Sequence, residues 1–251
     1  MENYLKIYQN KEEYNQEGNK PKLGHIVNDI ELVAPPPTTL ILNEYNFPDA
    51  NFRKALASIL GISEGDEITE AKIAATTRLE VNEKSIADLT GIEYFTALTE
   101  LNCDDNLLSL LDVSLNTSLT LLWCDNNQLT SLDVSKNTAI TNLYCGNNNL
   151  TSLDVSGCTA LKDLGCDNNK LTYLDASRCT ALKWLSCHSN QLTALDVSNC
   201  SELAMLWCYG NRMFFLDLMD NKKLKGLHID MNVEVISSRN FNKSLDIIRM
   251  D

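Results

Sequence analysis

Hydrophobic residues recur along this chain every 21 residues from residue 98 onward. With Leu98 counted as position one, position one of each unit is aliphatic, position four is leucine and position nine is asparagine. Position one holds Leu98, Leu119, Ile140, Leu161, Leu182, Leu203 and Leu224. Position nine holds Asn106, Asn127, Asn148, Asn169, Asn190, Asn211 and Asn232. The register has no insertion, so the pattern predicts a stack of equivalent repeats, preceded by one weaker unit that is one residue longer.

Each unit predicts two short extended segments and no helix. Side chains at positions one, four, six, eleven, fourteen and sixteen are expected to point inward, where one unit can bury them only against its neighbours. The second half of each unit is built around Leu-Asp-Val with flanking Ser and Thr, which suits a short strand. We expect either two parallel sheets or one sheet and an extended turn, with no helix from 98 to 244.

A typical unit, LTLLWCDNNQLTSLDVSKNTA (119–139), resembles the L-x-x-L-x-L-x-x-N-x-L pattern of leucine-rich repeats. Its second half, LTSLDVS, nearly repeats the first. The chain therefore resembles the 21-residue, nested class of bacterial leucine-rich-repeat proteins over residues 76–244. The resemblance implies a mainly β solenoid: a right-handed superhelix with a parallel concave sheet, short convex strands and capped ends. A buried Asn at position nine would bond backbone groups that the turn leaves unpaired.

The segment before the repeats predicts a helical cap. Phe52, Leu56, Ile59 and Leu60 lie on one face of a helix that begins near Asp49 and ends at Gly61. A second short helix is expected from Thr69, with Ile73 facing inward. Residues 41–77 resemble the helical N-terminal cap of internalin-like proteins. The linking segment 61–72 has the outline of a calcium-binding loop, but its ligand positions hold Gly and Lys, so we expect no metal.

The two ends of the chain are expected to differ from the repeats. Residues 1–40 hold two strand-like segments, 5–8 and 25–33, followed by Pro35-Pro36-Pro37, which predicts a small module or arm with a stiff linker. The repeats are expected over 78–244. Their last copy degenerates, with Glu234 and Arg239 at normally buried positions, and 245–251 is expected to form a C-terminal cap strand.

Nine cysteines fall in two columns. Position six holds Cys103, Cys124, Cys145, Cys166, Cys187 and Cys208, and position nineteen holds Cys158, Cys179 and Cys200. In-register parallel strands point the cysteine side chains of one column in the same direction instead of toward one another, and the number of cysteines is odd. We therefore expect buried, inert thiols and not disulfides. A zinc site needs converging ligands, which a column does not supply.

An acidic column recurs at position fifteen, on the convex or lateral surface. It comprises Asp112, Asp133, Asp154, Asp175, Asp196 and Asp217. Neighbouring carboxylates repel, so something must offset them. Hydrogen bonds to loop amides or hydroxyls are the favoured explanation, and calcium bridging is the alternative.

The candidate binding surface is the concave face, because positions three, five and seven alternate with buried positions. All three tryptophans of the chain fall there. The proposed binding residues are Trp123, Tyr144, Trp184, Met205, Trp207, Tyr209, His188, Asp104, Asp125 and Asp167. Aromatic residues of this kind are enriched in binding hot spots. The three aspartates would favour a basic edge on the partner.

These residues predict a non-enzymatic protein-binding module, which the resemblance places in bacterial adhesion or host contact. The alternatives are a carbohydrate-binding surface and an assembly component that docks through residues 1–40. Flat rings spaced along a line would favour glycan, whereas a contiguous patch would favour protein. No catalytic residues and no cofactor are expected. His188 follows Cys187, but adjacent strand residues point to opposite faces. The sequence shows no nucleophile elbow, phosphate-binding loop or His-Glu metal motif.

The charge of the chain narrows the partners further. With 34 acidic and 21 basic residues, the formal net charge is −13. Such a chain repels phosphates and anionic lipid, so we do not expect it to bind nucleic acid. No stretch approaches the ~18 apolar residues of a membrane-spanning helix, so we do not expect membrane insertion. The first residues lack a signal-peptide pattern. If the chain is truncated, the resemblance suggests a secreted or cell-surface location; otherwise a cytoplasmic location is expected. We expect the chain to be a monomer.

Overall fold

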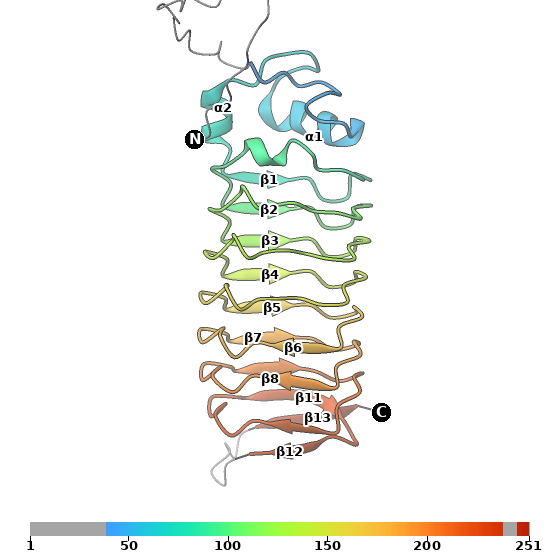
Figure 1. The fold of residues 1–251 in the computed structure, drawn as a ribbon, viewed down its shortest axis with the longest axis vertical. Helices are drawn as coiled ribbons and strands as arrows, with labels where there is room; N and C mark the ends of the chain where they lie inside the picture. The colour runs from blue at the N-terminus through green and yellow to red at the C-terminus, as the bar shows by residue number, and fades with distance from the viewer. Residues whose placement is uncertain (1–38, 238–244, 251) are drawn as a thin grey trace, which may run out of the picture. The chain divides into compact units, whose positions relative to one another are not determined.

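The computed structural model describes residues 39–237 and 245–250. These residues form a stack of repeats that begins with two helices and continues as a β solenoid (Figure 1). Residues 1–38, which hold nearly all of the predicted N-terminal module, lie outside the described residues, as does Arg239.

One parallel sheet of nine strands runs the length of the stack, with one strand from each turn. The strands are β1 (Arg78–Glu80), β2 (Glu100–Asn102), β3 (Leu121–Trp123), β4 (Asn142–Tyr144), β5 (Asp163–Gly165), β7 (Trp184–Ser186), β9 (Met205–Trp207), β11 (Gly226–Asp230) and β13 (Asp246–Met250). Leu101 pairs with Leu122, 21 residues later, and the same register continues to β11. The predicted β solenoid is confirmed.

The second half of each repeat forms strands only toward the C-terminal end. There β6 (Tyr173–Asp175) pairs with β8 (Ala194–Asp196), and β10 (Phe215–Asp217) pairs with β12 (Glu234–Ile236). In the earlier repeats the equivalent residues are extended without strand pairing. Both expectations for this side of the repeat therefore hold, each in a different part of the chain.

A sharp turn follows six strands of the large sheet, from β2 to β9, and explains the residue types at position eight. These residues have positive φ, between 50° and 66°: Asp105, Asn126, Asn147, Asn168, Ser189 and Gly210. Left-handed backbone is unfavourable for most side chains and least so for Gly, Asn and Asp. The Asp-Asn and Asn-Asn pairs of the repeats thus supply a turn residue at position eight and the ladder asparagine at position nine.

The asparagine at position nine ties each repeat to the one before it, except in the last repeat, where Asn232 is exposed. Asn127 donates from Nδ2 to the carbonyl oxygens of Cys103 in the preceding repeat and of Cys124 and Asp125 in its own, at 3.0–3.3 Å. Its Oδ1 accepts from the amide of Leu108 at 3.0 Å. Four backbone groups at each turn therefore find partners in a single buried side chain, as predicted.

Position nineteen carries a second ladder in which Cys replaces Asn. Asn137 Nδ2 donates to the carbonyl oxygens of Val113 and Asn116, but its Oδ1 is buried without a partner. Cys200 Sγ lies 3.2 Å from the carbonyl oxygen of Ala176, the equivalent acceptor. A thiol is a weak donor, yet it leaves no orphaned acceptor, so both residues suit this position.

All nine cysteines are buried and none is paired. The six at position six are fully covered in the interior between the two halves of the repeats. Burial raises the pKa of these thiols, and it raises the pKa of Cys158 to about 11. Thiolate is the reactive form of cysteine, so these side chains act as small apolar core residues.

Two helices cover the N-terminal end of the stack. Helix α1 (Ala50–Leu60) begins after Asp49, whose carboxylate accepts from two amides of its first turn and from Ala87 of the first repeat. Helix α2 (Glu70–Ala75) begins after Thr69. A short 3-10 turn, η1 (Ile92–Tyr94), follows β1. Both predicted helices are present, and no helix among the described residues is long and apolar enough to cross a membrane.

The cap packs through an aromatic cluster rather than through every predicted apolar position. Phe47 contacts Phe52 and Phe95, with ring centroids 5.9 and 6.5 Å apart. Ile59 was predicted on the buried face, but 42% of it is exposed. Ala55 is buried instead, because the face that meets the stack follows Phe52, Ala55, Leu56 and Leu60. From α2, Lys72 donates from Nζ to the carbonyl oxygen of Leu60 at the end of α1.

The last repeat departs from the period. Leu216 pairs with Val235, 19 residues later, and Leu227 pairs with Ile247, 20 residues later. The shortened turn buries Val233 and leaves Glu234 exposed. Glu234 was assigned to a normally buried position of the repeat, but it pairs with the exposed Phe215, because the sequence register was extended past the point where the repeat shortens.

We predict that Asn127→Ala destabilises the protein by about 3 kcal/mol or more, because it leaves three carbonyl oxygens and one amide without their hydrogen-bond partner. Urea unfolding followed by circular dichroism measures the change in the free energy of unfolding. Gln128→Ala, which removes the exposed side chain next to it, should change this free energy by less than about 0.5 kcal/mol. A loss below about 1 kcal/mol for Asn127→Ala would contradict the role of the ladder.

Candidate functional site

The outward face of the nine-stranded sheet carries the predicted binding residues. We call the side chains at positions three, five and seven of the repeats the sheet face. All ten predicted binding residues lie there and are partly exposed, while the side chains between them are buried. Strand geometry thus separates the two sets as the sequence predicts.

Aromatic rings on the sheet face form one contiguous row across six repeats. The centroids of Trp123 and Tyr144 are 6.2 Å apart with their planes 12° from parallel, and Tyr144 and Trp184 are 6.1 Å apart. Trp184 meets Trp207 edge-on at 5.7 Å, and Trp207 lies 5.3 Å from His228. Aromatic pairs at these spacings attract one another. We call these five residues the aromatic row.

A glycine allows the row to pass from one column to the next. Tyr144 is at position five, whereas Trp184 is at position three, and Gly165 lies between them. A Cβ on Gly165 would stand 3.1 Å from Cδ1 of Tyr144 and 3.4 Å from Cζ3 of Trp184. The absence of a side chain therefore lets these two rings meet. Gly165 was not singled out from the sequence, although a lone small residue between aromatic repeats was visible there.

Met205 extends the apolar surface beside the row. It lies over Gly226, where a Cβ would come within 2.1 Å of the Met205 sulfur. Met205 is at position three on β9, next to Trp184 on β7. The flexible thioether thus lengthens the apolar surface toward β11.

A second group of rings lies at position seven. His188 stacks on Tyr209 with centroids 4.5 Å apart and planes 6° from parallel. Its Nε2 lies 3.6 Å from Oδ2 of Asp167, and its Nδ1 lies 3.1 Å from Oγ of Ser189. His188 therefore joins the acidic residues of this column to Tyr209.

Asp104 and Asp125 are partly buried, although residues at the edge of a binding surface are usually exposed to solvent. Oδ1 of Asp104 accepts from the amide of Asp125 at 2.7 Å, and Oδ1 of Asp125 accepts from the amide of Gly146. Burial raises the pKa of Asp104 to about 6, opposed by that hydrogen bond. Burial, followed by the charge of Asp104, raises the pKa of Asp125 to about 7. Both carboxyls therefore titrate near neutral pH.

The sheet face is acidic as a whole. From Glu100 to Asp230, no described residue at positions three, five or seven is Lys or Arg. At the edge, Arg78 is held by Glu80 at 2.6 Å and Glu100 at 2.7 Å. Among the described residues at these positions, the remaining carboxylates therefore have no Lys or Arg neighbour, and Asp167 lies near His188. The face combines an apolar aromatic row with a negative surrounding.

Two arrangements weighed in the sequence, a metal site and a Cys187–His188 dyad, can be compared with the described residues. No group of three or more metal-ligating side chains converges among them. Cys187 and His188 directly follow β7. The Cys187 side chain is fully buried, whereas the His188 side chain lies on the sheet face beside Tyr209. These two neighbours therefore do not form a dyad, as the alternation of strand residues predicts.

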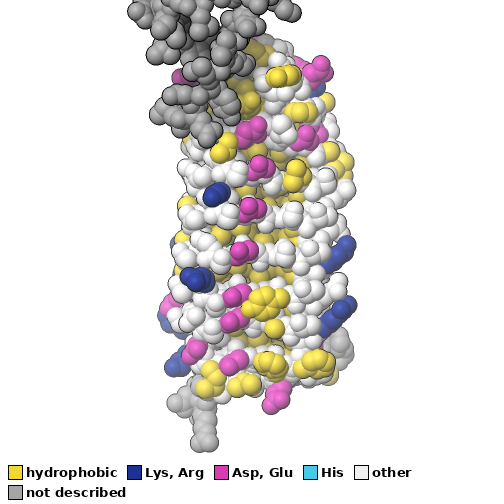
Figure 2. All heavy atoms as spheres, viewed as in Figure 1, with side chains coloured by type: hydrophobic (Ala, Val, Ile, Leu, Met, Phe, Trp, Pro, Cys, Tyr) yellow, Lys and Arg dark blue, Asp and Glu magenta, His cyan; other side chains and the backbone are white. Residues whose placement is uncertain are grey.

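The acidic column on the opposite side of the repeats has a structural explanation. Oδ1 of Asp133 accepts from the amide of Ser135 at 2.8 Å, and the five equivalent aspartates make the same bond two residues on. These bonds lower the pKa of Asp112 and Asp133 and offset the repulsion along the column. Figure 2 shows a line of acidic side chains running along the solenoid.

Comparison with known proteins agrees with this geometry. No protein-family model matches the chain. The chain is 41% identical over 100 residues to Internalin J of Listeria monocytogenes serotype 4b (strain F2365), over 36% of this chain and 11% of that protein. The crystal structure of internalin C2 from L. monocytogenes 4b F2365 matches with a TM-score of 0.76 and 21% identity, over 86% of this chain and 100% of that chain. The chain has the leucine-rich-repeat fold and is similar in sequence to an internalin over part of its length.

The fold of this chain is shared more widely. YopM, a leucine-rich effector protein from Yersinia pestis, matches with a TM-score of 0.64 and 24% identity, over 83% of this chain and 56% of that chain. At these identities the solved structures establish the fold alone. The chain spans about a tenth of the length of the Internalin J proteins it matches.

We predict that carbon-13 NMR titration of the aspartate carboxyls gives midpoints near pH 6 for Asp104 and near pH 7 for Asp125. Asp133 should titrate below the usual midpoint of about 4. Asp104→Asn should lower the midpoint of Asp125, because it removes a neighbouring charge. Asp133→Asn is the matched control and should leave it unchanged. Midpoints near 4 for both residues would contradict their burial.

The raised pKa values of Asp104 and Asp125 determine whether their contribution to the free energy of unfolding rises or falls with pH. The folded-state pKa values of Asp104 and Asp125 lie above the unfolded value, so the folded state holds more protons between about pH 4 and pH 7. Their contribution to the free energy of unfolding should therefore fall as pH rises through this window.

Proposed function

We propose that this chain is a protein-binding module that holds its partner against the aromatic row and Met205. The observation that carries this proposal is the contiguity of the row. Trp123, Tyr144, Trp184 and Trp207 contact one another in sequence and stay partly exposed. A joined apolar surface with large rings at its centre and polar groups around it has the make-up of an interface hot spot.

Ring orientation favours protein over glycan. Carbohydrate binding uses ring faces that are open to solvent. Here Trp123 and Tyr144 stack on each other, and the edge of one ring in the Trp184–Trp207 pair meets the face of the other. Because these rings cover part of one another's faces, they present an irregular apolar ridge. A protein surface can match such a ridge with its own side chains.

Charge around the row favours a partner with a basic rim. Asp104, Asp125 and Asp167 line one side of the face, and Asp163 lies on β5. Basic residues on the partner would gain attraction there and steer its approach. Binding such a residue would also favour the ionised form of Asp125, whose pKa is raised to about 7.

The internalin likeness directs the search for this partner. We propose that it is a protein on a host or bacterial cell surface, and that this chain works outside the cytoplasm. Docking through residues 1–40 stays a prediction, since residues 1–38 lie outside the described structure.

We predict that a Trp123→Ala/Trp184→Ala/Trp207→Ala variant loses the protein partner that the wild-type chain captures from host-cell or bacterial extracts. Hot-spot rings each contribute about 2 kcal/mol or more, so affinity should fall by at least roughly 100-fold. Immobilised protein, mass spectrometry and a glycan array run in parallel identify the ligand class.

The matched control for this experiment is Tyr45→Ala/Phe214→Ala, which removes two highly exposed rings away from the sheet face. It should capture the same partner as the wild type. Circular dichroism confirms that each variant is folded. Equal capture by the wild type and the triple variant would contradict the proposal. Binding only on the glycan array would indicate that the aromatic row recognises carbohydrate and not protein.

A further inference from the structure

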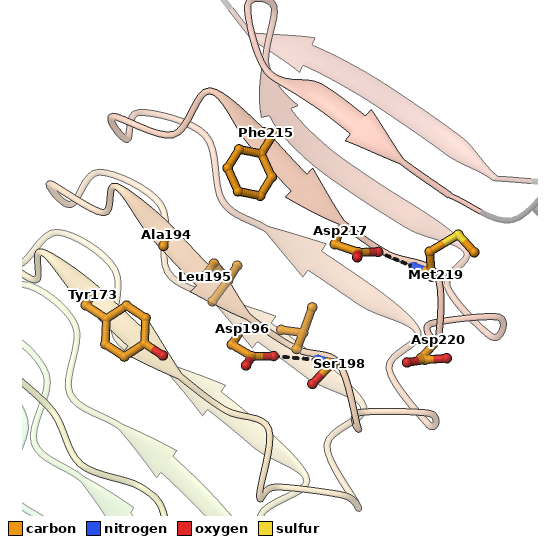
Figure 3. A pocket seen from close by; sticks show the side chains of 10 residues that line it. Tyr173, Ala194, Leu195, Asp196, Ser198, Phe215, Asp217, Met219 and Asp220 are labelled. Carbon is orange, nitrogen blue, oxygen red and sulfur yellow. Dashed lines mark hydrogen bonds between the residues drawn. The ribbon is translucent and has the colours of Figure 1, made fainter.

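A separate hollow lies on the side of the repeats opposite the sheet face, near the C-terminal end. It has a volume of about 370 Å³. Residues of β6, β8 and β10 and of the turns after β8 and β10 line it: Tyr173, Ala194, Leu195, Asp196, Val197, Ser198, Phe215, Asp217, Met219 and Asp220. Figure 3 shows Tyr173 and Phe215 on either side of Ala194 and Leu195.

Two aromatic rings form the walls of the hollow. Tyr173 and Phe215 occupy position thirteen of their repeats and are 52% and 58% exposed. The repeat between them has Ala194 at this position, and two earlier repeats have Ser131 and Ser152. Paired strands two repeats apart would be separated by ~10 Å, and β8 and β10 are not paired, so Tyr173 and Phe215 leave open space over Ala194. That space admits one extended side chain.

The floor lies where the sheet on this side is interrupted. Strand β8 pairs with β6, and β10 pairs with β12, but β8 and β10 do not pair with each other. Leu195 in the floor is only partly buried, whereas Leu174 and Leu216 at the same position are covered. The break thus leaves apolar surface open between the two rings.

The end of the hollow near the turns is negatively charged. Asp196 and Asp217 each use Oδ1 to accept from an amide two residues on, at 2.9 Å. Among the residues that the structure describes, neither Oδ2 atom accepts a hydrogen bond from an amide, and Asp220 lies beside them. None of the ten lining residues is Lys or Arg. Partial burial, with the charges of Asp175 and Asp196, raises the pKa of Tyr173.

We propose that this hollow binds a cationic side chain, arginine above all, presented on a basic segment of a protein partner. The aliphatic stem lies between Tyr173 and Phe215 over Ala194, and the guanidinium reaches Asp196 and Asp217. Apolar walls with carboxylates at one end match the two parts of this side chain. A guanidinium can also lie against an aromatic face and bond two acceptors, which an ammonium does less well. The site stands apart from the sheet face, so it does not depend on the proposed function.

The test is an NMR titration of the full chain with three tripeptides, acetyl-Gly-X-Gly-amide, in which X is arginine, citrulline or norleucine. Citrulline keeps the shape of arginine without its charge, and norleucine keeps only an apolar stem. The arginine peptide should shift the amides of Tyr173, Ala194, Ser198 and Met219 saturably, with millimolar affinity. The other two should bind at least roughly tenfold more weakly. Equal binding by citrulline or norleucine, or shifts confined to other surfaces, would overturn the proposal.

Variants separate the hollow from the general acidity of the chain. Tyr173→Ala and Phe215→Ala should each weaken the arginine peptide by roughly 3- to 5-fold. Asp196→Asn/Asp217→Asn should weaken it by roughly tenfold or more. The matched controls are Phe214→Ala, an exposed ring outside the hollow, and Asp133→Asn, in the same acidic column. Equal losses in the controls would show diffuse attraction and overturn the site, as would full binding by the hollow variants.

Discussion

The structure depends most on the buried asparagine in the turn after each strand from β2 to β7 of the nine-stranded sheet. One amide side chain, such as that of Asn127, bonds carbonyl oxygens in two successive repeats and accepts from a backbone amide as well. These groups would otherwise be buried without partners in the turn. Because the same bonds recur, each turn leaves the strand at the same residue, and equivalent positions stay in register from β2 to β11.

That register decides where chemistry can occur. Inward positions become columns of Leu, Cys and Asn, and burial raises the pKa of the thiols far above the range in which they react. Outward positions become columns that meet solvent, so aromatic residues scattered through the sequence become one row. Large rings held by a stacked core lose little freedom on binding, which suits a recognition surface.

Periodic features could be predicted from the sequence, and features that depend on neighbouring repeats could not. The period placed Trp123 and Trp207 on the sheet face and Cys103 in the core. It could not show that Asp125 is half-buried beside Gly146, nor that Gly165 lets Tyr144 reach Trp184, because both depend on contacts between repeats. The hollow beside Phe215 was missed for a similar reason. It lies where β8 and β10 separate, a break that no single repeat reveals.

The most direct measurement of recognition through the sheet face is hydroxyl-radical footprinting of the wild-type chain with and without its captured partner, read by mass spectrometry. Oxidation of Trp123, Trp184 and Trp207 should fall sharply in the complex, while oxidation of the exposed rings of Tyr45 and Phe214 stays unchanged. Unchanged oxidation of the three tryptophans in a saturated complex, with protection elsewhere, would contradict binding through the aromatic row.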